Sequence, residues 1–300
     1  MVANSAGDGA TPAAAGVAPS VPGTEMAGAP LLRLRGVGKA FGPVQALTGI
    51  DLDIPAGQVT ALVGDNGAGK TTLIKCIAGI HEPSSGQLLW NGRAVHLHSP
   101  KDASNLGIAT VYQDLALADN LDIVQNMLLG HEKTHFGILD EISMELTAKQ
   151  TLKDLRVTTV RSIRQPVGSL SGGQRQAVAV AKAVMQEAKL VIMDEPTAAL
   201  GVTQTELVLD LITTLASRGH AVIVVSHNLT DVFRVADRVA VLYLGRLATV
   251  GPASEFDSQS VVEYMTTGSA SRNGNGNGNG SGIASAASTA ASSGSEGRQT

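Results

Sequence analysis

The sequence contains a single cysteine, Cys76, among its 300 residues. One thiol forms no disulfide within the chain, which is typical of a protein of the reducing cytoplasm. Because Cys76 stands in an apolar helix pattern between Lys75 and Ile77, we expect a buried core thiol. The sequence therefore excludes a disulfide scaffold and argues against cysteine catalysis.

Long apolar runs and clusters of basic residues are also missing. No stretch approaches the roughly 18 consecutive apolar residues that a membrane-spanning helix requires. The net charge is −4, and no run of Lys or Arg is able to follow a phosphate backbone. The N-terminus lacks the basic start and compact apolar run of a secretory signal. We therefore expect a chain that does not span a membrane by itself and binds no nucleic acid.

The two ends of the chain differ in composition from its middle. Residues 1–30 and 266–300 consist mostly of small and polar residues, which predicts a disordered N-terminal extension and a low-complexity disordered tail. Hydrophobic residues make up 43% of the whole chain and charged residues 16%, a balance that supports a sizeable core. We therefore expect one folded domain over residues 31–265.

The first part of that domain alternates between apolar and polar residues. Residues 31–42 and 47–57 follow a period of two, which predicts antiparallel strands with one solvated face. Asn91-Gly92, between two further apolar runs, is a strong signal for a two-residue hairpin. The sequence thus predicts an N-terminal antiparallel β subdomain.

The remaining strands read as continuous apolar runs, as expected for parallel strands buried on both faces, in residues 59–64, 107–113, 190–195 and 221–226. Residues 239–250 predict a closing hairpin. Between 114 and 188 the pattern changes, because residues 115–130 and 142–157 favour helix. The sequence therefore predicts an α/β fold whose mostly parallel core sheet carries an inserted α-helical subdomain.

A glycine-rich segment between a predicted strand and a predicted helix matches the phosphate-loop pattern G-x-x-x-x-G-K-[ST]. Glycines let backbone N–H groups converge on a polyanion, and the helix start adds positive dipole. Lys70 supplies a charge to the β and γ phosphates, and the Thr71 hydroxyl can enter a Mg²⁺ shell. The predicted ATP-binding residues here are Gly64, Asp65, Asn66, Gly67, Ala68, Gly69, Lys70, Thr71 and Thr72.

Two carboxylates, Asp194 and Glu195, end an apolar run at the carboxyl end of a predicted strand. Ligands of open α/β sheets bind at this edge. Asp194 is placed to hold Mg²⁺, directly or through water. Glu195 is the candidate catalytic base, which accepts a proton from or orients the water that attacks the γ phosphate.

The segment Leu170-Ser171-Gly172-Gly173-Gln174 resembles the signature of the ATP-binding cassette (ABC) proteins. Ser171 can cap a second helix start whose free amides grip a γ phosphate. In the family this signature contacts the ATP held by a facing subunit. The resemblance therefore implies that Ser171, Gly172, Gly173 and Gln174 bind nucleotide across a two-fold homodimer with two shared ATP sites.

Three further positions resemble the cassette pattern in the expected order. Gln113 is similar to the family's glutamine that contacts Mg²⁺ or the water that attacks the γ phosphate. In the family this glutamine also communicates to a membrane partner whether ATP is bound. His227 is similar to the switch histidine that donates to the γ phosphate. Phe41 resembles the aromatic residue on which adenine stacks. The resemblance thus adds Gln113 and His227 to Lys70 and Glu195 as catalytic candidates, and Gln113 to the metal site.

The resemblance covers residues 31–251 and implies the P-loop ATPase fold of that family, with a RecA-like core sheet and with ATP and Mg²⁺ as its ligands. Several segments are similar to the ATP-binding subunits of bacterial monosaccharide importers of the ribose, xylose and fructose type. The implied partners are membrane permease subunits and, indirectly, an extracytoplasmic sugar-binding protein. The permease is expected at residues 114–126 and the helical insert, which places the chain at the cytoplasmic face of the cell membrane.

Two alternatives stay open. A soluble ATPase without a membrane partner uses the same site, and a transporter subunit for another substrate has the same motifs. The sequence also departs from the family at Gly201, where many cassettes carry Asp. That change removes a carboxylate which in the family helps to couple the two ATP sites.

Overall fold

The computed structural model describes residues 30–135 and 137–269. The predicted disordered segments, 1–30 and 266–300, lie outside the described residues except at Pro30 and over residues 266–269. Residues 266 and 267 belong to the last helix, α8 (Ser258–Thr267). Within the described residues, no helix combines the length and the apolar character that a bilayer crossing requires.

A four-stranded antiparallel sheet forms from the alternating segments near the N-terminus. Leu32 and Leu34 turn inward and are fully buried, whereas their neighbours Arg33 and Arg35 are partly exposed. Asn91 and Gly92 both have positive φ values, as a two-residue hairpin requires, so the predicted hairpin is confirmed. In sheet order the strands are β2 (Val44–Ile54), β1 (Leu32–Phe41), β4 (Ser85–Trp90) and β5 (Arg93–Val95).

The continuous apolar runs form a second, six-stranded sheet that is parallel except for its last hairpin. Every residue of β3 and of β10 is buried, as predicted for strands covered on both faces. In sheet order the strands are β12 (Arg246–Pro252), β11 (Arg238–Tyr243), β3 (Val59–Gly64), β10 (Ala221–Val225), β9 (Leu190–Asp194) and β6 (Ile108–Val111).

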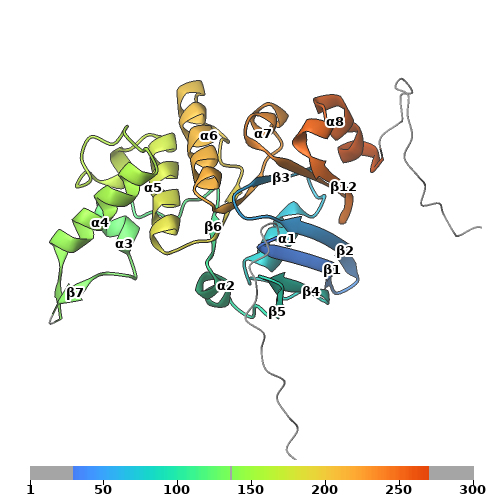
Figure 1. The fold of residues 1–300 in the computed structure, drawn as a ribbon, viewed down its shortest axis with the longest axis horizontal. Helices are drawn as coiled ribbons and strands as arrows, with labels where there is room; N and C mark the ends of the chain where they lie inside the picture. The colour runs from blue at the N-terminus through green and yellow to red at the C-terminus, as the bar shows by residue number, and fades with distance from the viewer. Residues whose placement is uncertain (1–29, 136, 270–300) are drawn as a thin grey trace, which may run out of the picture. The chain divides into compact units, whose positions relative to one another are not determined.

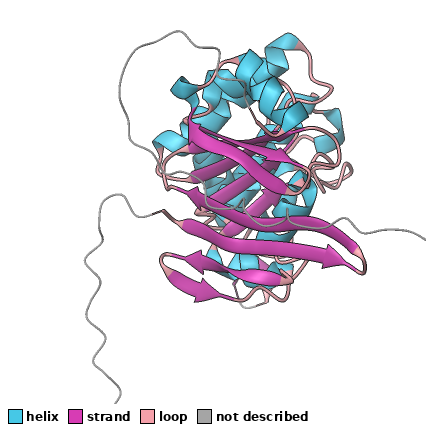
Figure 2. Cartoon of the chain, turned by 90° about the vertical axis from the view of Figure 1, so that its right-hand side faces the viewer, coloured by secondary structure: helices cyan, strands magenta, loops and turns pink. Residues whose placement is uncertain are grey.

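Separate clusters of apolar side chains cover the two faces of this sheet. On one face, helix α1 (Lys70–Ile77) packs between the sheet and the antiparallel strands. On the other, α5 (Gly172–Met185) and α6 (Val202–Ser217) pack against β9 and β10. Cys76 belongs to the first cluster, and burial raises the pKa of its thiol to about 11. Figure 2 shows most of the helices gathered above the strands.

Three short helices complete the domain. Helix α2 (Pro100–Leu106) begins with Ser99 as its N-cap and a proline in its first turn, as the Ser-Pro pair predicts. Helix α7 (Leu229–Val235) and α8 pack against β3 and β11.

The segment 114–188 contains helices and one short hairpin. Its elements are α3 (Ile123–Leu128), β7 (Thr134–His135), β8 (Ile138–Leu139), α4 (Glu141–Asp154), the single 3-10 turn Val167–Ser169, and α5. Figure 1 shows α3 and α4 in green at the opposite end of the described domain from the blue strands β1 and β2. The predicted helix over 142–157 is found, but the hairpin β7–β8 was not predicted.

The prediction of helix over residues 115–130 was wrong in its first half. Only Ile123–Leu128 is helical, because Asp122 and Gln125 form a capping box that starts the helix there. The preceding loop is held by Asn126, which is fully buried and accepts a hydrogen bond from Ala118 N at 2.8 Å. Its amide nitrogen donates to the Ala118 carbonyl at 2.9 Å. A buried asparagine that satisfies loop backbone groups thus replaces a helical turn.

Candidate functional site

The phosphate loop joins β3 to α1 in a backbone that requires glycine. Gly69 is the N-cap of α1 with φ 105°, and a Cβ there would lie 3.0 Å from the Ala46 carbonyl oxygen. A Cβ on Gly64 would lie 2.5 Å from the Leu242 carbonyl oxygen. No side chain caps α1, so the amides of its first turn stay open. The loop is therefore shaped to receive an anion.

Lys70 lies folded back over this loop. Its Nζ donates hydrogen bonds to the carbonyl oxygens of Gly64 at 2.7 Å and Asp65 at 3.0 Å. The ammonium group is thus held at the loop by backbone acceptors, and bound phosphate oxygens offer it stronger, charged ones. Its position agrees with the predicted contact to the β and γ phosphates, which stays a prediction.

A hollow of about 440 Å³ opens at the loop. The motif residues that line it are Asn66, Gly67, Ala68, Gly69, Lys70, Thr71 and Thr72. Val44 and Leu244, which are 62% and 71% exposed, line it as well and offer apolar surface to a purine base. Sequence reasoning missed both, because nothing in the residues around either position shows that the two turns line one hollow.

Phe41 is not part of the lining of that hollow. It ends β1, directly across the turn from Val44, and is 43% exposed. Its ring meets the ring of His81 edge to face at 5.2 Å between centroids, and Lys39 Nζ lies 5.2 Å from its centroid. Stacking of adenine on Phe41 stays a prediction, with Val44 next to it on the side of the hollow.

Asp194 and Glu195 follow β9 at the carboxyl edge of the core sheet, as predicted. Burial and the neighbouring Glu195 raise the pKa of Asp194, while the charges of Lys70 and Lys75 act to lower it. A carboxylate that is destabilised by its surroundings and lies in the field of Lys70 gains from a bound cation. The Thr71 hydroxyl, the Gln113 carboxamide and the Asp194 carboxylate are oxygen donors of the kind Mg²⁺ prefers, and their meeting at one metal ion stays a prediction.

Glu195 and His227 are brought together from the ends of two neighbouring strands. Glu195 follows β9 with φ 50°, and its N–H donates to the Val225 carbonyl at the end of β10 at 2.9 Å. Its Oε1 lies 2.9 Å from Nδ1 of His227. An ionised carboxylate only accepts, so in this pair Nδ1 carries the proton. The Glu195 side chain is 21% exposed and that of His227 is 72% exposed.

Gln113 lies beyond the end of β6 and is exposed. With Glu195 and Gly172 it lines a second pocket of about 410 Å³. The structure thus places the predicted glutamine and the candidate base around one space. The first residue of the signature helix borders the same space in the same chain.

The signature residues form the start of α5. Ser171 is its N-cap, and Ser171 and Gln174 form a capping box in which Gln174 Oε1 accepts from Ser171 N at 2.9 Å. A Cβ on Gly172 would lie 2.6 Å from Leu200 Cδ2, and one on Gly173 would lie 3.0 Å from Gln204 Cβ. The two glycines therefore let α5 approach the loop after β9 and the start of α6. None of the four signature residues belongs to the lining of the hollow at the phosphate loop.

Comparison with known proteins agrees with this arrangement. The family model described as ABC transporter matches residues 47–198. The chain is 45% identical over 237 residues to the xylose/arabinose import ATP-binding protein XylG of Sulfolobus acidocaldarius, which covers 79% of this chain and 94% of that protein. It is 44% identical over 248 residues to the fructose import ATP-binding protein FrcA of Rhizobium meliloti, which covers 80% and 95%.

One longer relative is matched by this chain over about half of that relative's length. The ribose import ATP-binding protein RbsA 3 of Rubrobacter xylanophilus is 40% identical over 236 residues, which are 79% of this chain and 47% of that protein. Among solved structures, a nucleotide-free ATP-binding cassette from an ABC transporter aligns with a TM-score of 0.65 and 25% identity, covering 74% of this chain and 91% of that one. CbiO1 from Clostridium perfringens, part of the transporter complex cbiONQ, gives 0.68 and 27%, covering 80% and 96%.

The chain therefore belongs to the ABC transporter family, as an ATP-binding and ATP-hydrolysing subunit. Its α/β fold, with a mostly parallel core sheet and an antiparallel N-terminal sheet, confirms the fold that the sequence predicts. The roles of the individual site residues are not tested by likeness, and they stand as proposals.

Proposed function

We propose that this chain energises the uptake of a simple sugar, as one of two identical ATPase subunits that close around two ATP molecules. The observation that carries the proposal is the Glu195–His227 pair at 2.9 Å, set at the sheet edge that also carries the phosphate loop. A base, a histidine donor and a phosphate-binding helix start are thus supplied by neighbouring strand ends.

Binding begins at the phosphate loop in this proposal. Lys70 exchanges its two carbonyl partners for the β and γ phosphates, and the open amides of α1 donate hydrogen bonds to the remaining phosphate oxygens. Val44 and Leu244 cover the base together with Phe41. Thr71, Gln113 and Asp194 are the residues that hold Mg²⁺, which supplies neutralisation of the charge on the phosphates.

Hydrolysis depends on a change of partner at His227. In the present structure its Nδ1–H donates to Glu195, so the carboxylate already has a donor. The side chain of His227 is 72% exposed and free to turn toward a bound γ phosphate. That turn releases the Glu195 carboxylate, which then orients and deprotonates the attacking water. Without a γ phosphate, the pair keeps the base occupied.

The second half of each site comes from the other subunit. Ser171 and Gln174 satisfy one another at the start of α5, and the amides of Gly172 and Gly173 remain for a γ phosphate. Since these residues do not border the chain's own phosphate loop, a second copy must present them. ATP then acts as the ligand that stabilises the closed dimer.

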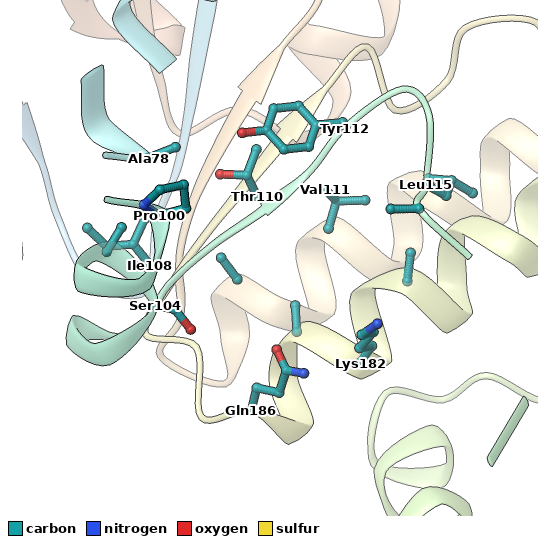
Figure 3. A pocket seen from close by; sticks show the side chains of 15 residues that line it. Ala78, Pro100, Ser104, Ile108, Thr110, Val111, Tyr112, Leu115, Lys182 and Gln186 are labelled. Carbon is teal, nitrogen blue, oxygen red and sulfur yellow. The ribbon is translucent and has the colours of Figure 1, made fainter. Parts of the chain in front are cut away.

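The membrane partner is proposed to dock on residues 114–126 and the helical insert. Next to this segment lies a pocket of about 270 Å³ between α2, β6 and α5. Figure 3 shows Tyr112 and Leu115 on one side of it and Lys182 and Gln186 on α5 on the other. Burial lowers the pKa of Lys182, whose ammonium group has no ion-pair or hydrogen-bond partner among the described residues. A permease segment that carries a carboxylate complements this pocket.

Sugar import is proposed from the relatives, whose names describe import of xylose or arabinose, fructose and ribose. It places the chain at the cytoplasmic face of a cell membrane, with an extracytoplasmic sugar-binding protein acting on the same permease. Uptake of each labelled sugar by cells with and without this chain tests the substrate. If no membrane protein co-purifies with the chain, a soluble ATPase without a transport partner replaces the proposal.

The substitution Glu195→Gln tests the catalytic part. We expect the variant to bind ATP normally, to lose ATPase activity by at least about 100-fold, and to form an ATP-dependent dimer visible by size-exclusion chromatography. Gln keeps the size of the side chain but is not a base. Rapid turnover by this variant removes Glu195 from the role of base, and a strictly monomeric, fully active wild type contradicts the shared site.

A further inference from the structure

The loops that carry Glu195 and His227 are joined at a second, buried point. The Oδ2 atom of Asp231 accepts a hydrogen bond from Thr197 Oγ1 at 2.8 Å and another from Asn228 Nδ2 at 3.0 Å. Thr197 lies two residues after Glu195, and Asn228 directly follows His227. One carboxylate oxygen thus links the loop after β9 to the loop after β10.

Asp231 is well placed to hold both loops. It lies in the first turn of α7 and is 8% exposed. A buried carboxylate requires donors, and removal of either one leaves Asp231 Oδ2 with one of these two hydrogen bonds. Burial therefore keeps the Asp231 side chain in this position. Asp231 in turn restrains Thr197 and Asn228, which donate to it.

This contact is not needed to cap the helix. The Oδ1 atom of Asn228 already accepts from the amides of Thr230 at 3.1 Å and Asp231 at 3.4 Å. The Asp231 carboxylate is turned to the other loop instead. Since the N-terminal amides of α7 have their acceptor, the Thr197–Asp231 contact serves the arrangement of the two loops.

The loop after β9 needs such a restraint. Glu195 and Ala199 have φ values of 50° and 59°, a conformation that side-chain-bearing residues adopt only when the surrounding structure holds them there. The backbone of Glu195 is held at its N–H by the Val225 carbonyl at 2.9 Å and at its carbonyl by the Ala198 amide at 3.1 Å. The Thr197 side chain adds the contact with Asp231, which ties this turn to the loop after β10.

We propose that Asp231 is a positioning residue for ATP hydrolysis, which sets Glu195 against His227 by holding Thr197 and Asn228 together. The proposal rests on the roles assigned above to Glu195 and His227. Asp231 itself touches no substrate. Its loss changes the geometry of the reacting groups and leaves the phosphate loop, and with it ATP binding, as it was.

The test measures ATPase kinetics of the purified full-length chain with two single variants and their combination. Thr197→Val removes the hydroxyl at nearly constant volume, and Asp231→Ala removes the acceptor. We expect each to lower kcat by about tenfold with KM for ATP within about twofold. Because both break one contact, the double variant should be no slower than the slower single variant.

Two controls separate positioning from folding. Thr197→Ser keeps the hydroxyl, so it should retain kcat within about twofold of wild type. Glu206→Ala removes the ion pair between α6 and Arg234 of the same helix α7, and it should leave kcat unchanged. Should Asp231→Ala fail to fold, the Thr197 pair carries the test alone.

The outcomes distinguish this inference from the proposed function. Wild-type kcat in Thr197→Val, equal losses in Thr197→Val and Thr197→Ser, or additive effects in the double variant each overturn the role of Asp231. Glu195→Gln and His227→Ala are measured in parallel. If these two hydrolyse ATP at the wild-type rate, the assigned catalytic roles fail, whatever the Thr197 variants do.

Discussion

Two glycine-containing helix starts, those of α1 and α5, are built in different ways. At α1 the N-cap is Gly69 in a left-handed conformation, and no side chain accepts from the first turn. At α5 the N-cap is Ser171, and its capping box with Gln174 satisfies one amide on each side. The start of α5 is thus partly satisfied without a ligand and keeps the amides of Gly172 and Gly173 open, whereas no side chain satisfies any amide at the start of α1.

In the proposed mechanism, this difference lets one chain hold a nucleotide at α1 and contact a second nucleotide through α5. The open start of α1 collects several amides and Lys70 around one anion, which gives a binding site within the chain. The start of α5 keeps its conformation before any nucleotide arrives, because a capping box stabilises a helix start by about 1 kcal/mol. In the proposed dimer, this preformed helix start can contact the ATP that is already bound to the partner subunit.

The substitution Ser171→Arg gives the largest expected effect on this comparison. We expect ATPase activity to fall by at least about 100-fold, because the bulky cation blocks the γ phosphate of the facing subunit. The affinity of a single chain for ATP should stay unchanged, since α1 alone supplies that site. Equilibrium binding of a fluorescent ATP analogue and steady-state ATPase rates measure both quantities. Normal ATPase activity contradicts the division of labour between the two helix starts.

The far end of α5 supplies the second prediction. Lys182→Met removes the charge from the pocket beside Tyr112 and keeps the aliphatic stem. We expect affinity for the detergent-solubilised permease to fall by about tenfold or more, because a partner carboxylate loses its ion pair in a partly buried site. The control is Arg218→Met, at an exposed arginine at the end of α6 and outside the proposed docking surface.

The ATPase rate of the purified chain distinguishes the outcomes of this second experiment. It should be the same in Lys182→Met, Arg218→Met and wild type. Equal loss of permease binding in both variants shows a general effect of charge, and it removes Lys182 from the docking site.

A third prediction concerns the stability of the open site next to α1. The pKa of Asp194 is raised mainly by burial, so its ionised form destabilises the fold. In the absence of Mg²⁺ and nucleotide, we expect Asp194→Asn to unfold a few degrees above wild type near neutral pH. The difference should shrink as the pH falls toward the ordinary carboxyl range, because Asp194 takes up its proton in the folded state first.

Thermal unfolding followed by circular dichroism at several pH values measures this effect. Ser171→Ala is the matched change at the other helix start, and it should lower the midpoint because it removes a cap. If the unfolding midpoint of Asp194→Asn also lies below that of wild type, the ionised Asp194 side chain does not destabilise the fold.

Local patterns in the sequence predicted the parts of the structure that depend on local physics. The phosphate loop, the capping box at Ser171 and the hairpin at Asn91-Gly92 are all fixed by residues within a few positions of one another. The apolar runs identified the core strands for the same reason, because burial on both faces leaves a continuous signal.

The features that sequence reasoning missed depend on contacts between distant segments. Asn126 holds the first half of the predicted helix as a loop by bonding to the loop backbone, and its burial is set by the tertiary fold. Val44 and Leu244 meet at the hollow although 200 positions separate them in the chain. The contact between Thr197 and Asp231 likewise forms only when β9 and β10 pair. No local pattern signals any of these.

Helix α6 offers the smallest and sharpest test of how helix starts are built. Its N-cap is Gly201, which, like Gly69, provides no side-chain cap. Unlike Gly69, however, Gly201 has an extended backbone with φ −75°, and a Cβ there meets nothing within 4 Å. Gly201→Asp should therefore stabilise the fold by about 0.5 kcal/mol through capping and the helix dipole. We expect the unfolding midpoint to rise by about 1 to 2 °C.

The control Gly201→Ala separates the cap from the backbone, because alanine restricts the unfolded chain but accepts no hydrogen bond. A rise in Gly201→Asp that exceeds the rise in Gly201→Ala shows that the carboxylate caps α6. Equal midpoints in the two variants contradict that role. The same substitution at Gly69 should disable ATP binding, since a Cβ there meets the Ala46 carbonyl at 3.0 Å in a left-handed backbone. At α1 the uncapped helix start is therefore needed for the ligand, although it lowers the stability of the fold. At α6 a side-chain cap can be added without affecting ATP binding.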